Sequence, residues 1–383
     1  MTSFAFRSPQ ILFGNGERRR AAGLAARFGG KVLLVTGASS LERSGALGEL
    51  TDSLDALGVE VTRWAVPGEP DIDLVDSGAA ACREAGCGVV LAVGGGSVLD
   101  TGKAIAAMAT NPGEVLDYLE EVGTGQTVDT APLPVIAVPT TAGSGSEVTR
   151  NSVIRVPAAS VKRSLRSDQL LPRVAVVDPE LSSTAPAPVA AAAGLDALTH
   201  LIESYVCLKA QPMTDAYALP GIRLAAAGLH GLAGGGGTAQ QRSLASLWGG
   251  ICLANAGLGA VHGLAAPLGG TACIAHGVAC ACLLPATIRV NVEALRSRAP
   301  ESPALDRYDE VFRVVNPSDP TADGTAAALD DLRRGLGVPA LSVAGLRAGE
   351  LKGVVAGSRG GSMRANPIAL TDAELESILH AAL

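Results

Sequence analysis

Aromatic residues are scarce in this chain, at 3% of 383 residues, although 48% of the residues are hydrophobic. The cores must therefore be built from Ala, Val and Leu. No apolar run is expected to reach the roughly 18–20 residues of a membrane helix, which argues against a membrane partner. The 30 Lys and Arg residues are outnumbered by 37 Asp and Glu residues, for a net charge of −7. Basic residues are also scattered, so the composition argues against nucleic-acid binding.

The cysteines do not suggest the disulfide framework of a secreted protein. There are seven, an odd number, and residues 1–10 show no charged-then-apolar signal pattern. We therefore expect a reduced, cytoplasmic protein. Cys280 and Cys282 follow His276, where thiols are either metal ligands or small buried side chains. We favour buried side chains, because one C-x-C pair is a weak metal signal.

The chain is long enough for two domains with separate cores. Residues 1–183 alternate strand and helix patterns, which predicts parallel βαβ units in an α/β domain. An additional β pair is expected within 151–177. From residue 184 the helical period dominates, which predicts an all-helical domain over 184–383. Strands are expected at 31–37, 59–66, 88–94 and 133–139, and helices at 17–28, 42–57, 73–86 and 98–109.

Three of the five histidines, together with one carboxylate, form a candidate metal site. Asp196 and His200 are spaced i, i+4, so a helix places them on one face. His262 and His276 each precede a glycine. One carboxylate and three imidazoles suit Fe²⁺ or Zn²⁺. The alternative is that these are separate polar residues among apolar helices.

A glycine turn follows the apolar run at 88–93. Gly94, Gly95, Gly96 and Ser97 interrupt the run, and a helical pattern containing Asp100 begins there. A strand, glycine turn and helix present backbone N–H groups to a phosphate. The pattern is neither G-x-G-x-x-G nor a Walker motif, and an ordinary strand-to-helix turn is the alternative interpretation.

A second small-residue loop, Pro-Thr-Thr-Ala-Gly-Ser-Gly-Ser-Glu at 139–147, follows the apolar run ending at Val138. Its hydroxyl groups and glycines suit contact with a ribose or phosphate. Taken alone, the segment is better explained as a polar loop.

Together these segments resemble the iron-containing (group III) alcohol dehydrogenase family. The resemblance covers nearly the whole chain in the expected order. It is carried by GGGSVLDTGKAIA at 94–106, PTTAGSGSEVT at 139–149, VVDPELS at 176–182, GLDALTHLIESYV at 194–206, NAGLGAVHG at 255–263, HG at 276–277, FRSPQILFGNG at 6–16 and SMRANP at 362–367.

The resemblance implies a Rossmann-like domain that binds NAD or NADP, an all-helical metal-binding domain, a cleft between them, and the architecture shared with dehydroquinate synthase. It also implies a homodimer or larger homo-oligomer. Matched residue by residue, it assigns Asp196, His200, His262 and His276 to the metal. It assigns Gly95, Gly96, Ser97 and Asp100 to the diphosphate loop, Thr140, Thr141 and Ser144 to the nicotinamide side, and Val153 and Lys162 to other cofactor contacts.

Two positions depart from the family pattern. Ala266 stands where the family often has a histidine near the substrate, so protons must move through water and ribose hydroxyls, or the substrate differs from a simple alcohol. Gly37 replaces an aspartate that in many NAD-preferring members accepts from the adenosine ribose and repels a 2′-phosphate. Ser39 and Arg43 could meet such a phosphate. We predict that NADP is tolerated, unless Gly37 only makes a tight turn.

The predicted reaction is hydride transfer between NAD(P)H and an aldehyde or ketone, with the metal polarising the carbonyl oxygen. No catalytic residue is expected beyond the metal ligands. If Arg364 faces the cleft, it would allow an acidic substrate such as maleylacetate or a phosphonoaldehyde, but we favour a surface charge or a cofactor contact for this residue. Rival functions are a dehydroquinate synthase-type lyase, a glycerol dehydrogenase-like enzyme, and a non-catalytic or narrow-substrate member because of Ala266. Substrate contacts are expected from Asn151, Leu253, Ala266 and Ser362.

Overall fold

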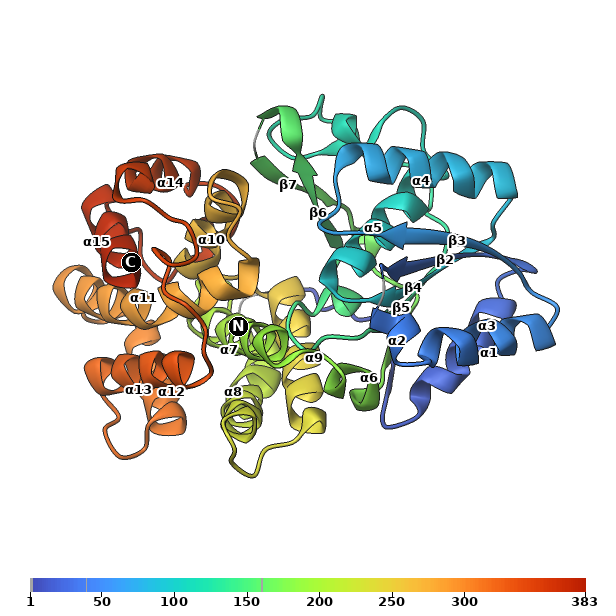
Figure 1. The fold of residues 1–383 in the computed structure, drawn as a ribbon. Coiled ribbons are helices and arrows are strands. Elements are labelled where there is room, and N and C mark those ends of the chain that lie inside the picture. Colours follow the sequence, from blue (N-terminus) through green and yellow to red (C-terminus); the bar gives the residue numbers. More distant parts are fainter. Residues whose placement is uncertain (1–2, 39, 160) are drawn as a thin grey trace. The chain divides into compact units, whose positions relative to one another are not determined.

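The computed structural model describes residues 3–38, 40–159 and 161–383 (Figure 1). The chain forms an α/β unit, residues 8–185, and a helical unit that begins at Pro186. The α/β unit followed by a helical unit confirms the predicted fold class. Residues 3–7 were predicted to belong to the first domain, but they pack with the helical unit. There the Arg7 N–H donates to Asn255 Oδ1 at 2.7 Å, and the Phe6 ring stacks on Tyr217.

The α/β unit is built on a six-stranded, all-parallel sheet with the order β1-β8-β5-β4-β2-β3. Antiparallel strands β6 and β7 form a separate pair. The strands are β1 (Gln10–Phe13), β2 (Lys31–Gly37), β3 (Glu60–Val66), β4 (Val89–Gly94), β5 (Val135–Pro139), β6 (Asn151–Val156), β7 (Val161–Arg166) and β8 (Val174–Val177).

Helices cover both faces of this sheet, as a buried parallel sheet requires. Alternate residues of each central strand face opposite sides, so Leu33 packs with α4 and α5 while Leu34 packs with α1 and α3. The helices of this unit are α1 (Ala21–Ala26), α2 (Ser40–Arg43), α3 (Ala46–Ala56), α4 (Ile72–Ala85), α5 (Gly96–Met108) and α6 (Pro179–Ser183).

Two strands of the large sheet, β1 and β8, were not predicted from the sequence. Residues 174–177 fell in the segment expected to form only an additional β pair, yet β8 joins the main sheet between β1 and β5. Both β1 and β8 are only four residues long. Strands of this length carry little periodicity, so their assignment depends on pairing with each other rather than on local pattern.

The helical unit has one continuous core formed by nine long and short helices together with the loops between them. Pro186 and the proline at position 188 mark the start of its first helix, where proline is well tolerated. The helices are α7 (Ala187–Val206), α8 (Pro212–Leu232), α9 (Ala239–Asn255), α10 (Ala260–Thr271), α11 (His276–Arg298), α12 (Pro303–Val315), α13 (Ala322–Gly335), α14 (Leu351–Gly357) and α15 (Asp372–Ala382).

One of these helices, α11, is long and apolar enough to cross a membrane, contrary to the expectation that no such stretch exists. Its most apolar window is 78% buried within the protein. The bent pair α9 and α10 is also long and apolar enough when the two helices are taken together. Buried core helices of soluble proteins can be equally long and apolar, so the length and composition of these helices are weak evidence for a membrane span.

Candidate metal centre and nucleotide-binding loops

Helix α7 supplies two of the four predicted metal ligands. Its alanine-rich first half favours helix, and Asp196 and His200 follow one turn apart on one face. Both side chains are buried, with exposed fractions of 6% and 3%. Helix α9 can approach closely here because Gly249 has no Cβ, which would lie 3.2 Å from the Cβ of His200. Close packing therefore holds His200 in place.

Helices α10 and α11 bring the other two predicted ligands to α7. His262 lies in the first turn of α10, and His276 is the first residue of α11. A Cβ at Gly277 would lie 2.6 Å from the carbonyl oxygen of Ala192, so a glycine after His276 lets α11 begin against α7. Each histidine is thus presented at the start of a helix.

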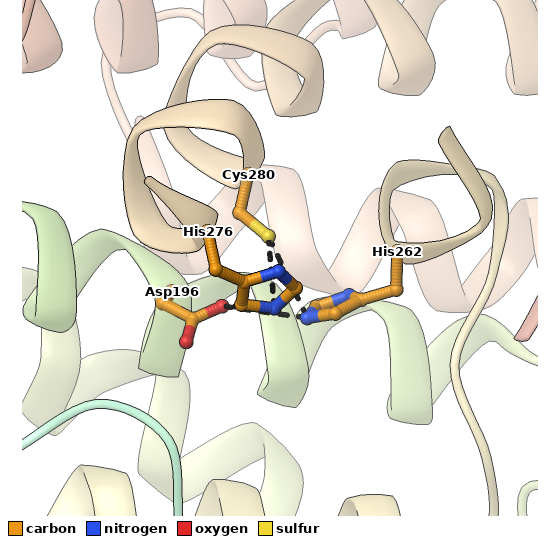
Figure 2. A group of neighbouring side chains, drawn as sticks. All are labelled: Asp196, His262, His276 and Cys280. Carbon is orange, nitrogen blue, oxygen red and sulfur yellow. Dashed lines mark hydrogen bonds and ion pairs between the residues drawn. The ribbon is translucent and has the colours of Figure 1, made fainter. Parts of the chain in front are cut away.

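All three imidazoles converge on one carboxylate oxygen. The Nε2 atoms of His262, His276 and His200 lie 3.3, 3.7 and 3.9 Å from Asp196 Oδ1. The rings of His200 and His262 stack with their centroids 4.6 Å apart. His276 is half-exposed, with 46% of its side chain accessible. Figure 2 shows Asp196, His262 and His276 pointing toward one another, so the predicted ligands form one cluster with an accessible edge.

The ionisable groups of this cluster shift one another's pKa values. Burial alone would raise the pKa of Asp196, but the imidazoles of His200, His276 and His262 outweigh burial and hold the pKa of Asp196 well below its usual range. Burial likewise opposes protonation of His262, yet the neighbouring Cys280, Asp196 and Glu203 raise the pKa of His262 well above its ordinary value. The carboxylate is thus ionised, and positive charge is favoured around it.

The cluster fits a divalent metal ion. Asp196 Oδ1 is buried and accepts no hydrogen bond from the residues that the structure describes. Such a buried, unsatisfied oxygen is costly unless a cation or another partner meets it. Carboxylate and imidazole ligands suit Fe²⁺ and Zn²⁺ alike. Asp196, His200, His262 and His276 would hold the ion.

Glu203 supports this cluster, although the sequence pattern did not identify it as a site residue. Its Oε2 lies 2.6 Å from His262 Nδ1, and its Oε1 accepts the Val261 N–H at 2.7 Å. A Cβ at Gly259 would lie 2.8 Å from Glu203 Oε1, so glycine makes room for the carboxylate at the start of α10. A proton held on Nδ1 leaves Nε2 of His262 free to bind metal.

Cys280 also lies in the cluster. Its Sγ is 3.6 Å from His262 Nε2 and 3.7 Å from His276 Nε2. Burial raises the pKa of this thiol to about 12, while His262 opposes the rise. Cys282, by contrast, donates to the carbonyl of Pro339 at 3.1 Å. Both thiols are buried, as predicted, and Cys280 in addition faces the candidate ligands.

The predicted nucleotide-binding segments meet at the carboxyl edge of the parallel sheet. Gly37 ends β2 and Gly94 ends the neighbouring strand β4, with Thr36 paired to Val93. The chain passes from β2 to β3 on one side and from β4 to β5 on the other. This reversal is a topological switch point, where open α/β sheets bind their ligands. The predicted residue Ser39 lies outside the described residues.

The amino end of α5 is available to an anion. Gly95 precedes the helix and makes no side-chain cap. Among the described residues, the N–H groups of Gly96 and Ser97 have no acceptor and can meet a phosphate, whereas the Val98 N–H donates to the carbonyl of Gly95. A Cβ at Gly96 would lie 2.8 Å from Ser144 Oγ, and one at Gly95 would lie 3.4 Å from Thr141 Oγ1. The Thr140 N–H donates to the carbonyl of Gly94 at 2.9 Å. The predicted glycine turn, which continues into Ser97, and the hydroxyl loop are therefore adjacent.

The side chain of Asp100 on α5 links this helix to the hydroxyl loop and to β6. Its Oδ1 accepts the hydroxyl of Ser146 at 2.5 Å and lies 3.0 Å from Lys103 Nζ, and its Oδ2 accepts the Val153 N–H at 3.0 Å. These contacts give Asp100 and Val153 a positioning role that the resemblance did not assign. Lys162, another predicted cofactor contact, forms an ion pair with Glu69 at 2.5 Å.

Buried Glu147 gives this loop a pH-dependent stability. Desolvation raises its pKa to about 7, against a smaller lowering by Lys103. Because the unfolded-state pKa is about 4.3, the stabilising contribution is complete below that pH and is lost as pH rises to about 7. At about 1.36 kcal/mol per pKa unit, the loss should be at most about 4 kcal/mol. Denaturant unfolding across pH 4.5–8 is expected to show this fall.

The Glu147→Gln variant should remove that pH dependence, since an uncharged amide imitates the protonated acid. It should unfold at higher denaturant than the parent protein at pH 8, with the difference vanishing toward pH 4.5. Exposed Glu84 on α4 provides the matched Glu84→Gln control, which should follow the parent curve. Parallel curves for Glu147→Gln and the parent protein at all pH values would contradict the assignment.

The predicted substrate residues are divided between the units. Asn151 begins β6, and its carbonyl accepts from Lys103 at 2.5 Å. Ala266 is exposed on α10, one turn after His262, and Leu253 is partly buried on α9. Ser362 lies in the short helix Gly361–Ala365, which packs on α10. In the helical unit, then, Ala266 and Ser362 lie on segments in contact with each other.

Comparison with known families identifies both parts of the chain. Residues 8–179 match the model of the iron-containing alcohol dehydrogenases. Residues 190–383 match the model of the C-terminal part of the same family. The two matches together span nearly the whole chain in one order.

Known proteins share both the sequence and the fold. A probable alcohol dehydrogenase of Escherichia coli K12 is 39% identical over 294 residues, which cover 76% of this chain and 73% of that protein. A solved 1,3-propanediol oxidoreductase matches with a TM-score of 0.89, 32% identity and full coverage of both chains. Sulfoacetaldehyde reductase of Bifidobacterium kashiwanohense, solved with NAD⁺, matches with a TM-score of 0.85 and 29% identity, covering 100% of this chain and 99% of that one.

Proposed function

Because this chain belongs to the iron-containing alcohol dehydrogenase family, we propose that it transfers hydride between NADH or NADPH and an aldehyde or ketone, using Fe²⁺ or Zn²⁺. The chain is an oxidoreductase of the alcohol dehydrogenase or aldehyde reductase type. The observation that carries the proposal is the convergence of three imidazoles on the buried, unsatisfied oxygen of Asp196. All seven cysteines are free, which supports a cytoplasmic location.

A divalent metal in this site would supply Lewis-acid polarisation of a carbonyl oxygen, and the reduced nicotinamide would supply the hydride. The protein's part is to hold and orient the metal and the reactants. Asp196 is committed to the cluster by three imidazoles, so it is not free to act as a general base. Glu203 fixes the Nδ1 proton of His262. The accessible edge at His276 lets a small carbonyl compound approach the ligands.

The nucleotide is assigned to the α/β unit. The first N–H groups of α5 would bind the diphosphate, and Asp100 would keep the adjoining hydroxyl loop in place. Because Ala266 offers no imidazole, the proton that completes the alcohol would come from water or a ribose hydroxyl. This interpretation needs no further catalytic side chain.

NADP competence follows from Gly37 at the end of β2. Without a carboxylate there, nothing at that position repels a 2′-phosphate, and the exposed Arg43 lies six residues further along the chain. A carboxylate placed beside the phosphate would cost several kcal/mol. The Gly37→Asp variant is therefore expected to lose NADPH-dependent turnover by about tenfold or more while keeping NADH-dependent turnover.

The test is oxidation of NADH and NADPH, followed through the loss of reduced-nicotinamide absorbance, with a panel of neutral and acidic carbonyl compounds. The full chain would be loaded separately with Fe²⁺ or Zn²⁺. Metal-dependent turnover with either cofactor, lost in His262→Ala, is the expected result. Gly37→Asp provides the cofactor control. Metal-loaded protein that binds nucleotide but reduces no carbonyl would favour a non-catalytic member instead.

A further inference from the structure

Cys280 lies closer to the candidate ligands than a packing role requires. It is on α11, one turn after His276, and is fully buried. Its Sγ contacts Nε2 of His262 at 3.6 Å and Nε2 of His276 at 3.7 Å. These are the same nitrogen atoms that approach Asp196 Oδ1. In Figure 2 the thiol points into the space between the two rings and the carboxylate.

Four of the six separations among the ligand atoms of Asp196, His262, His276 and Cys280 are close to those of a tetrahedral metal site with one sulfur ligand. Nitrogen or oxygen ligands bound at about 2.05 Å in a tetrahedron lie about 3.4 Å apart, and a sulfur at about 2.3 Å lies about 3.6 Å from each of them. The observed O–N separations are 3.3 and 3.7 Å, and the N–S separations are 3.6 and 3.7 Å. All four ligand atoms lie within 4.8 Å of one another.

The Nε2 atom of His200 lies farther out, 3.9 Å from Asp196 Oδ1. The group whose ligand atoms all lie within 4.8 Å of one another comprises Asp196, His262, His276 and Cys280, and it does not include His200. The buried Asp196 Oδ1, which no described hydrogen bond satisfies, is an independent sign that a cation belongs at the centre of this set.

We propose that Cys280 is a protein ligand of the metal, and that its thiolate biases the site toward Zn²⁺ over Fe²⁺. The proposal rests on the proposed function, which requires a divalent metal in this cluster. Thiolates are soft ligands that favour Zn²⁺, while imidazole and carboxylate serve both ions. Binding forms one sulfur–metal bond and breaks the S–H bond of Cys280. The proton goes to solvent, with no change of oxidation state.

Cobalt reports sulfur ligation directly. The full chain, stripped with a chelator under reducing conditions and reloaded with Co²⁺, should show a thiolate-to-cobalt charge-transfer band in the near ultraviolet as well as the visible d–d bands. Cys280→Ser should lose the near-ultraviolet band and keep the visible bands. Cys282→Ser is the matched control, because this thiol is two residues away and donates to Pro339; it should retain both.

The outcomes separate the two proposals. Visible cobalt bands without the near-ultraviolet band in the parent protein would overturn the role of Cys280 while leaving the metal-dependent function standing. A parent protein that binds neither Co²⁺ nor Zn²⁺ would overturn both. A near-ultraviolet band that survives in Cys280→Ser would assign the sulfur to another residue and also overturn the proposal.

Metal selectivity gives a second readout. The stripped protein would be dialysed anaerobically against equal concentrations of Zn²⁺ and Fe²⁺, and the bound metals measured by elemental analysis. Losing a direct ligand should cost at least as much as losing an outer partner, whose removal weakens binding by about 10–100-fold. Because Zn²⁺ prefers the thiolate more than Fe²⁺ does, this loss should be greater for Zn²⁺, and the Zn:Fe ratio should fall in Cys280→Ser and stay unchanged in Cys282→Ser. An equal ratio in Cys280→Ser and the parent protein would refute the zinc bias.

Discussion

The Asp196→Asn variant is expected to lose its metal and, with it, hydride transfer. The amide has nearly the same shape but no charge, and its NH₂ group or neutral oxygen would face three imidazole nitrogens at 3.3–3.9 Å. Metal affinity should fall by at least about 100-fold, because a direct ligand matters more than the outer partners whose loss costs 10–100-fold. Turnover should fall by about 10³-fold or more, as when a main electrostatic stabiliser is removed.

Elemental analysis of the purified variant, together with reduction of a carbonyl by NADH, measures both effects. Asp215→Asn is the matched control. This carboxylate also lies in the helical unit, but it forms an ion pair with Arg307 and should leave the metal in place. Asp196→Asn protein that keeps a full equivalent of metal and its turnover would show that the carboxylate is not a ligand.

The sequence was informative about the metal cluster because its ligands follow helical spacing. Asp196 and His200 are one turn apart, and His262 and His276 each lie in the first turn of a helix beside a glycine that permits close packing. Glu203 follows the same rule, since it lies seven residues after Asp196 and so on the same face of α7. The spacing of Glu203 was therefore visible in the sequence. A carboxylate on a helix face is normally solvated, however, and only the contacts of Glu203 in the structure reveal that it supports His262.

Cys280 could not be interpreted in the same way. Its spacing of four from His276 was visible, yet one C-x-C pair does not distinguish a ligand from a small core residue. The distinction depends on where α10 places His262 relative to α11, which is a tertiary fact. The two thiols of this pair prove to have different surroundings, with Cys280 beside imidazole nitrogens and Cys282 beside a carbonyl.

In the α/β unit, local pattern was sufficient where strands are central and continuous. β2 and β4 are strands of seven and six residues with continuous buried stretches, and both were expected at nearly their observed bounds. Lys103 shows the limit of local pattern. It is a fully buried cation satisfied by Asp100, the hydroxyl of Thr149 and two backbone carbonyls, and no sequence spacing predicts such a network.

The Glu203→Gln variant is expected to weaken metal binding by about 10–100-fold, although Glu203 is not among the candidate ligands. Both oxygens of the carboxylate are engaged, with Oε1 accepting from Val261 N–H, and Oε2 accepting from His262 N–H and meeting His262 Nδ1. An amide has a single oxygen. Either Val261 N–H loses its acceptor, or the NH₂ group turns toward His262 and donates to Nδ1, which moves the imidazole proton to Nε2.

The proton on Nε2 must be displaced before His262 can bind metal, so the variant should bind metal more weakly through the same set of ligands. Competition with a chromophoric chelator measures it. Glu310→Gln is the control, because this carboxylate accepts from the Tyr205 hydroxyl on α7 and should leave affinity unaltered. Because excess metal should restore most of the turnover in Glu203→Gln but not in Asp196→Asn, the two variants separate a residue that orients a ligand from one that is a ligand. Equal affinity in Glu203→Gln and the parent protein would show that the His262 tautomer is set by something other than Glu203.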